Sequence, residues 1–152
     1  MEQRKNNTGH GHRTNNHSSQ NREQKIHKIE KPLHIYYADK SKLFLPDGKA
    51  YKIAESFKGI ATHQLRKILN QVKLCIQELG NKDVDFDSIK NQLFMLVPLS
   101  AYNGGREPKL KKIYRFLVEH LNENSITCKK DIEVFDELLT SIIAYHKFLG
   151  GK

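Results

Sequence analysis

The stretch ATHQLRKILNQVK, residues 61–73, decides the fold class, because its apolar residues recur at the period of an α-helix. On a helical wheel of about 100° per residue, the apolar side chains from Leu65 to Leu79 fall inside an arc of about 120°. These side chains are Leu65, Ile68, Leu69, Val72, Cys75, Ile76 and Leu79. We therefore predict a helix that begins with Thr62 as its N-terminal cap, ends before Gly80, and buries one face in a core.

Further along the chain the pattern is helical throughout, without useful runs of alternating polar and apolar residues. The other predicted helices are at 51–59, from Asp87 to a kink or end at Pro98, from Pro108 to about Asn122, and from a cap at Thr127 to Leu149. We also predict a chain break at Gly104-Gly105 and an extended segment at 33–46 that packs on the body. The fold class is therefore all-α, a compact bundle of about five helices in a single domain at residues 32–152.

The last predicted helix has an unusually wide apolar face. Its members are Ile132, Phe135, Leu138, Leu139, Ile142, Ile143 and Leu149. Such a width indicates either a central helix or one that is shared with a neighbouring subunit.

Residues 1–31 have a composition that cannot bury enough apolar surface to offset the entropy cost of ordering. They hold seven Lys and Arg against three Glu, with many Asn, Gln, Ser and His residues and only two isoleucines. We predict a disordered basic tail. His10 and His12 could bind a metal ion, but no further fixed ligands accompany them, so we predict no metal site.

The chain is strongly basic, with 26 Lys and Arg against 17 Asp and Glu and a formal charge of +9. This balance favours a polyanionic partner such as RNA, DNA or acidic lipid. The sequence shows no membrane span and no secretory signal. Cys75 and Cys128 stand far apart without the spacing of a zinc site, which predicts two reduced thiols in a cytoplasmic protein.

The cations gather on helix faces that lack acidic residues. On the helix quoted above, Arg66 and Lys73 lie two turns apart and share a face with Asn70, and no carboxylate of that helix joins them. Their separation of about 10 Å is roughly the reach of two phosphates on one strand. In the fourth predicted helix, Lys111 and Arg115 lie opposite the core face. These two faces predict contacts to a nucleic-acid backbone.

One catalytic spacing is present, because Arg115 and His120 fit the R-x4-H pattern of the all-α HEPN ribonucleases. In those enzymes the histidine assists proton transfer at the 2′-OH and the arginine supports the phosphate. Residues five apart on a regular helix point about 140° apart, and Phe116 stands where that family usually has a polar residue. We therefore predict no enzymatic activity and no cofactor, with a HEPN-like ribonuclease as a remote alternative.

Three ordered segments resemble the small, all-helical subunit of type III-A CRISPR effector complexes, the Csm small subunit. The segments are THQLRK (62–67), AYNGGR (101–106) and AYHKFLGGK (144–152). Their order and spacing agree with that family over roughly residues 48–152. The residues that carry over are Gln64, Arg66 and Lys67, then Tyr102 and Arg106, then Tyr145, His146 and Lys147. Of these, we expect Tyr102, Tyr145 and His146 to be packing residues.

The resemblance implies a non-catalytic subunit that stacks head-to-tail beside the filament of backbone subunits that holds the guide RNA. Its basic faces would line the groove for the target RNA and the guide–target duplex. Expected partners are therefore guide RNA, target RNA, the backbone and large subunits, and further copies of this chain. Together with the wheel, the resemblance predicts as RNA-binding residues Gln64, Arg66, Lys67, Asn70, Lys73, Arg106, Lys111, Arg115 and Lys147.

Two other function classes stay open at this point. A helical regulator would read a specific nucleic-acid duplex as a dimer, whereas a scaffold protein would bind its neighbours and not use its cations. The Gly104-Gly105 loop favours the RNA-binding reading, because backbone amides before a helix N-terminus attract anions and Arg106 lies beside them.

Overall fold

The structure is a computed structural model that describes residues 25–152. All regular elements in that part of the chain are helical, which confirms the predicted all-α fold. Residues 1–24 lie outside the described residues, and with them most of the predicted tail, including His10 and His12.

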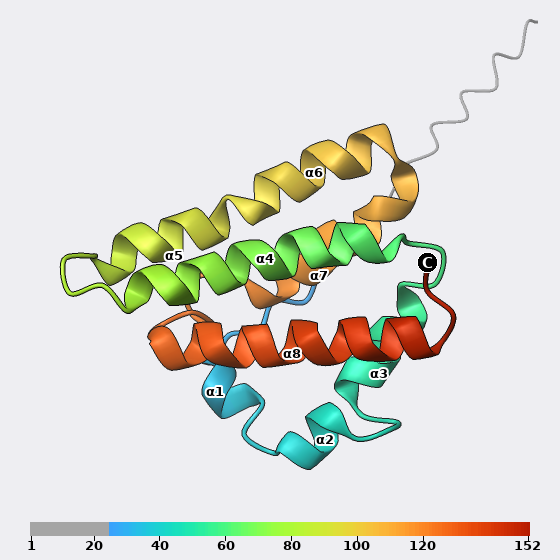
Figure 1. Ribbon diagram of the computed structural model, residues 1–152, viewed down its shortest axis with the longest axis horizontal. Helices are drawn as coiled ribbons and strands as arrows, with labels where there is room; N and C mark the ends of the chain where they lie inside the picture. Colours follow the sequence, from blue (N-terminus) through green and yellow to red (C-terminus); the bar gives the residue numbers. More distant parts are fainter. Residues whose placement is uncertain (1–24) are drawn as a thin grey trace, which may run out of the picture.

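The elements are α1 (Leu33–Tyr36), α2 (Lys40–Phe44), α3 (Lys49–Ser56), α4 (Thr62–Leu79), α5 (Phe86–Phe94), α6 (Leu96–Arg106), the 3-10 helix η1 (Pro108–Leu110), α7 (Lys111–His120) and α8 (Lys129–Phe148). α4 packs along α8, and α5 and α6 follow one another along the other side of α4 (Figure 1). α7 packs on α6, while α1 and α3 pack on α8. Within residues 25–152, no helix has the length and apolar character needed to cross a membrane.

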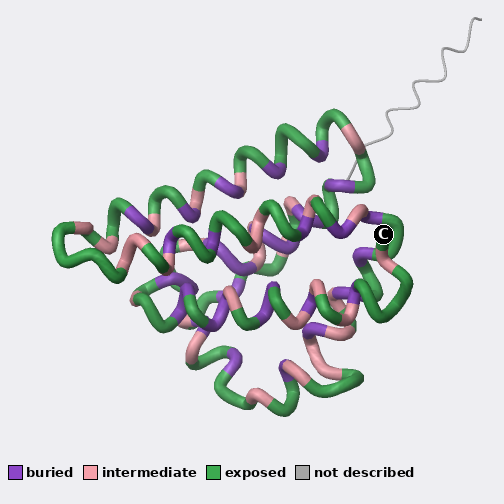
Figure 2. Tube along the Cα trace, in the orientation of Figure 1, coloured by how far each residue is buried: buried purple, intermediate pink, exposed green. Residues whose placement is uncertain are grey.

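α8 is the central helix of the bundle, which accounts for its wide apolar face. Its residues Ile132, Phe135, Leu138, Leu139 and Ile142 are fully buried, and α1, α3 and α4 cover them (Figure 2). The first of the two explanations for that width therefore holds for these five residues, whereas Leu149, at the end of the same face, is 39% exposed.

Two predicted irregular regions are helical in the structure. Residues 33–46, predicted to be extended, form the short helices α1 and α2. The break predicted at Gly104-Gly105 was also wrong, because both glycines lie within α6. Gly104 serves packing instead, since a Cβ there would lie 3.1 Å from Lys111 Cγ and 3.3 Å from Lys111 Cα. The missing side chain lets α6 and α7 approach closely.

The break predicted at Pro98 occurs three residues earlier, at Met95, where α5 ends and α6 begins. Pro98 itself lies in the first turn of α6. The physical reason is that Pro98 has no N–H to donate to the carbonyl of Phe94, one helical turn before it.

The predicted helix caps were wrong by one or two residues, because the hydroxyl and carboxyl groups have other partners. The residues that precede α4, α5 and α8 are Ala61, Asp85 and Cys128. Thr62 is the first residue of α4, and its hydroxyl lies 3.2 Å from His146 Nδ1. The Thr127 hydroxyl donates to Asp131 Oδ2 over 2.7 Å. The Thr62 contact joins α4 to the end of α8, whereas the Thr127 hydroxyl belongs to the local hydrogen bonds around Asp131 at the start of α8.

The last residues of the predicted tail contact the body. Ile29 is buried, its N–H donates to the Glu119 carbonyl over 2.9 Å, and its carbonyl accepts from Asn122 Nδ2 over 3.0 Å. Two isoleucines in a polar stretch are too few to carry a periodic signal, so composition alone placed residues 25–31 with the tail.

Candidate nucleic-acid interface

The exposed face of α4 carries Arg66, Lys67 and Asn70. Within residues 25–152, neither cation forms an ion pair with a carboxylate. A guanidinium and an ammonium without protein partners are available to an external anion, and a phosphate is the anion that such groups bind in nucleic acids.

Lys73 differs from the other predicted cations of α4. Its Nζ lies 3.0 Å from Oδ1 of Asp136 on α8. The helical wheel of α4 could not reveal this acid because it comes from a neighbouring helix. A phosphate at Lys73 would have to compete with Asp136, so Lys73 is the weaker candidate for an RNA contact.

A groove of about 480 Å³ runs between α4 and α6, with η1 and α7 at its base. Its lining from α4 is Gln64, Lys67, Ile68, Asn70 and Gln71, and its lining from α6, η1 and α7 is Leu96, Leu99, Ser100, Asn103, Leu110 and Ile113. Three predicted RNA-binding residues, Gln64, Lys67 and Asn70, therefore share one concave surface. The lining contains one cation and no acidic residue.

Arg106 and Lys111 lie close to this groove, at the connection between α6 and α7. Both side chains are exposed. The Arg106 guanidinium lies 5.8 Å from the centre of the Tyr102 ring, and Tyr102 is 65% exposed. The prediction that Tyr102 is a core aromatic was therefore wrong. Gly104 and Gly105 lie within α6, so their backbone amides do not form the loop before a helix that was predicted beside Arg106, and the anion site expected there is absent.

Lys147 lies in the last turn of α8, and its Nζ donates to the Gly151 carbonyl over 3.3 Å. The chain then returns to α4, where the Thr62 N–H donates to the Lys152 carbonyl over 2.9 Å. His146 is buried under this turn, and a Cβ on Gly151 would lie only 2.1 Å from its Nδ1. The glycine pair of AYHKFLGGK thus lets the chain fold closely over His146, which has the packing role expected for it.

Tyr145 is partly buried, as expected for a packing residue. Its hydroxyl donates to the Phe44 carbonyl, and its ring packs edge-on against Tyr51. Tyr145 therefore connects α8 to the ends of α2 and α3.

Five of the predicted cations lie at the same end of the bundle, where α4 begins, α6 and α8 end and α7 begins (Figure 1). We call the set Arg66, Lys67, Arg106, Lys111 and Lys147 the basic end. No member forms an ion pair within residues 25–152.

Arg115 is not part of the basic end. It lines a separate depression of about 340 Å³ between α3, α7 and the segment that precedes α1. The other lining residues are Lys25, Ile26, His27, Ile53, Ser56, Phe57, Lys112, Phe116 and Glu119. The sequence grouped Arg115 with Lys111 because both lie opposite the core face of one helix, but the fold gives them different surroundings.

The family model for Csm2 of type III-A systems matches residues 40–152, about three quarters of the chain. The chain belongs to the Csm2 family. It is therefore a small subunit of a type III-A Csm complex, as the three sequence segments had suggested. No curated protein and no solved structure matches the chain.

Csm2 is a family of structural small subunits, and the surroundings of His120 agree with that character. His120 is fully buried. Its Nδ1 lies 2.9 Å from the Phe116 carbonyl, so this nitrogen carries the proton and donates. Its Nε2 then accepts from the Tyr37 hydroxyl over 2.6 Å. No ring nitrogen is left for a substrate, and Arg115 is exposed on another side, so the pair does not form the site of a HEPN ribonuclease.

The buried His120 predicts a pH dependence of Csm2 stability. The pKa of His120 is lowered to about 3, chiefly by burial; the hydrogen bond to the Phe116 carbonyl opposes this shift, and the positive charge of Lys49 adds to it. The unfolded chain accepts a proton near pH 6.5 and the folded chain does not, so stability falls as the pH decreases from about 6.5 towards 3. The expected loss is about 1.4 kcal/mol per pH unit in that range.

Urea denaturation at pH 7.5 and pH 5.5 measures this loss. The double variant Tyr37→Phe with His120→Leu removes both hydrogen-bonding partners together and is expected to lose less stability on acidification than the wild type. An identical loss in both proteins would assign the pH dependence to other groups.

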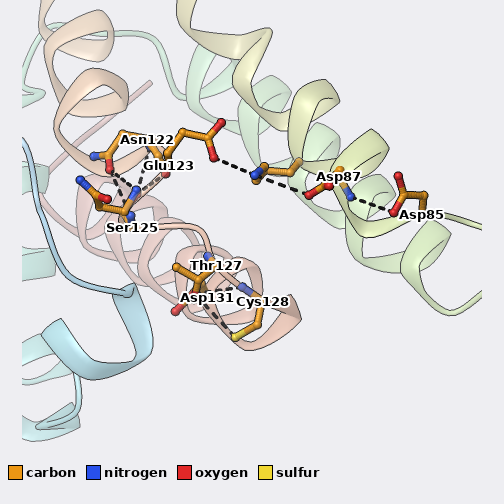
Figure 3. A network of polar contacts seen from close by, with 10 residues as sticks. Asp85, Asp87, Asn122, Glu123, Ser125, Thr127, Cys128 and Asp131 are labelled. Carbon is orange, nitrogen blue, oxygen red and sulfur yellow. Dashed lines mark hydrogen bonds and ion pairs between the residues drawn. The ribbon is translucent and has the colours of Figure 1, made fainter.

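One cluster of the described residues has ligand types that suit a metal ion: His34, Cys128 and Asp131. The Asp131 carboxylate is fully buried and already accepts hydrogen bonds from Thr127 and Cys128 (Figure 3) and from the backbone and ring of His34. A metal ion would have to displace several of these donors. The cluster is therefore best explained as the N-terminal cap of α8 and its anchor to α1.

Proposed function

We propose that the chain is a non-catalytic, RNA-binding subunit of a cytoplasmic type III-A interference complex and that its basic end contacts the phosphate backbone of the guide–target RNA duplex. The observation that carries this proposal is the basic end itself: five exposed cations without carboxylate partners in residues 25–152, in a Csm2 chain. Binding through phosphates suits a subunit that must accept any target sequence, because phosphate contacts carry no sequence information.

The opposite end of the bundle is mixed in charge, because exposed acids lie there beside the exposed Lys82, Lys129 and Lys130. Asp83, Asp85 and Asp87 are exposed at the connection between α4 and α5, and Glu123 is exposed after α7. Lys90 lies between these acids, 3.6 Å from Asp87 and 2.7 Å from Glu123 (Figure 3). This difference in charge orients the chain, because a polyanion is attracted more strongly to the basic end, which lacks ion pairs within residues 25–152, than to the mixed end.

The same difference in charge supports head-to-tail stacking of copies along the duplex. In such an arrangement, the exposed acids at the mixed end of one copy face the basic end of the next, and this order avoids the repulsion between two basic ends. The contact is heterologous, so it extends into a row instead of closing into a dimer.

The experiment that tests RNA binding is a salt titration of the isolated protein with single-stranded RNA of random sequence. Each phosphate neutralised on a single strand contributes about −0.7 to the slope of log affinity against log salt. If all five cations of the basic end take part, the expected slope is about −3.5. An affinity that is the same at low and moderate salt would contradict the electrostatic account.

A competition experiment distinguishes this proposal from the alternative of a regulator that reads a specific nucleic-acid duplex. Random RNA in excess is expected to displace the labelled RNA at least as well as duplex DNA of any single sequence. Strong preference for one DNA duplex would support the regulator instead.

A further inference from the structure

The phosphate contacts proposed for the basic end do not involve the apolar surface of the groove between α4 and α6. The base of this groove is apolar, formed by Ile68, Leu96, Leu110 and Ile113. Its volume of about 480 Å³ is within the range of roughly 300–1,000 Å³ that is common for small-molecule sites. At the rim, Leu99 is 53% exposed, so apolar surface is open to solvent.

Four amide side chains surround this apolar surface: Gln64, Asn70 and Gln71 from α4 and Asn103 from α6. In the described part of the chain, none of these four amides hydrogen-bonds another protein group. Each amide offers both a donor and an acceptor. An apolar slot with unpaired amides at its edge matches a flat heteroaromatic ring that has donors and acceptors on its rim.

The charges around the groove indicate the kind of molecule to which such a ring is attached. Lys67 belongs both to the groove lining and to the basic end. Arg66 neighbours it on α4, and Arg106 follows Asn103 by one turn on α6. Because the lining holds no acidic residue, the groove and its surroundings suit a ring attached to a phosphate chain.

We propose that this groove holds one unstacked nucleobase of the RNA strand whose phosphates lie on the basic end. The inference rests on the proposed function and adds to it a contact with a base. Aliphatic side chains cover the faces of the ring, and the amides bond its edge. Since each amide can turn to present its oxygen or its nitrogen, all four bases are accepted, and the contact stays independent of sequence.

The test compares two RNA oligonucleotides of equal length, one intact and one in which abasic residues replace several nucleotides. Both carry the same phosphates. The full chain is expected to bind the intact RNA about tenfold more tightly, with the same salt dependence for both. Equal affinity for both RNAs would overturn the inference, while a salt-dependent affinity would leave the proposed function in place. If neither RNA binds, the proposed function fails as well.

Two variants locate the contact. Leu99→Trp fills the groove and is expected to remove the tenfold preference for intact RNA. Met95→Trp places the same ring four residues earlier, just before α6, at a residue that is 56% exposed and does not line the groove, and should keep the preference. If Leu99→Trp retains the preference, or if it leaves RNA binding unchanged and only prevents joining other subunits, the groove does not bind a base. The second result would assign it to a protein partner.

Discussion

Replacing Arg66 and Lys67 with glutamate is expected to weaken RNA binding by at least about tenfold at low salt, and to leave folding almost unchanged. Both side chains are exposed and neither forms an ion pair within residues 25–152, so the substitutions remove no interaction of the folded chain. Exposed substitutions of this kind usually change stability by about half a kcal/mol. Two attractive phosphate contacts become repulsive, and the slope of log affinity against log salt should decrease in size by roughly 1.4.

The matched control is the double variant Lys82→Glu with Lys130→Glu. Both lysines are exposed, and they lie at the other end of α4 and at the start of α8. This variant has the same net charge as the first but keeps the basic end intact, so it should retain most of the RNA affinity. If the two variants lose affinity equally, the overall charge matters and the basic end is not a specific surface.

Lys73 is left out of this variant because of its ion pair with Asp136. Lys73→Glu would place two carboxylates next to each other on α4 and α8. Any loss of RNA binding would then be confounded with a change in the packing of the two longest helices.

Asp131→Ala is expected to destabilise the protein by about 3 kcal/mol. The buried carboxylate accepts hydrogen bonds from His34, 97 residues earlier in the sequence, and from the Thr127 N–H and hydroxyl. Alanine would leave these partly buried donors without their acceptor and would remove the hydrogen bonds that link α1 to the start of α8. Urea denaturation at neutral pH measures the loss.

Glu133→Ala is the matched control, because Glu133 is an exposed acid on the same helix. Its ion pair with Lys129 is at the surface, with 3.8 Å between the charged atoms, and its removal should cost less than about 1 kcal/mol. If the two variants are equally stable, the hydrogen bonds at Asp131 do not hold α1 and α8 together.

Low pH should also destabilise the protein, because it protonates the Asp131 carboxylate. Burial alone would raise the pKa of Asp131, but the hydrogen bonds from His34 and Thr127 outweigh it and lower the pKa to about 2. The stabilisation is therefore complete above about pH 4, the value for an unfolded chain, and is lost as the pH falls towards 2.

The sequence predicts most helices correctly because their apolar residues keep a regular period over two turns or more. α4 has the bounds that the pattern predicts, Thr62 to Leu79, and Leu65, Val72 and Cys75 of its predicted core face are buried. α6 was missed because two glycines usually weaken a helix. Here the close packing of Lys111 against Gly104 overrides that preference, and a local pattern cannot show such a contact.

The candidate site could be predicted only in part, because a helical wheel describes one helix at a time. The wheel placed Arg66 on an exposed face, and the structure agrees. It could not show that Asp136 of α8 reaches Lys73, or that Arg115 faces the segment before α1. The groove is formed by four elements and depends on how α6 lies beside α4, so no sequence pattern predicts it.

The central claim, that this Csm2 chain works as an RNA-bound subunit of a type III-A complex, is tested most directly by native mass spectrometry of the assembly purified through this chain. The affinity tag belongs at the N-terminus, because the Lys152 carbonyl accepts a hydrogen bond from Thr62. We expect a particle that contains guide RNA, the backbone and large subunits, and more than one copy of the chain. Purification of the chain alone, or of the chain with other proteins but without RNA, would contradict the claim.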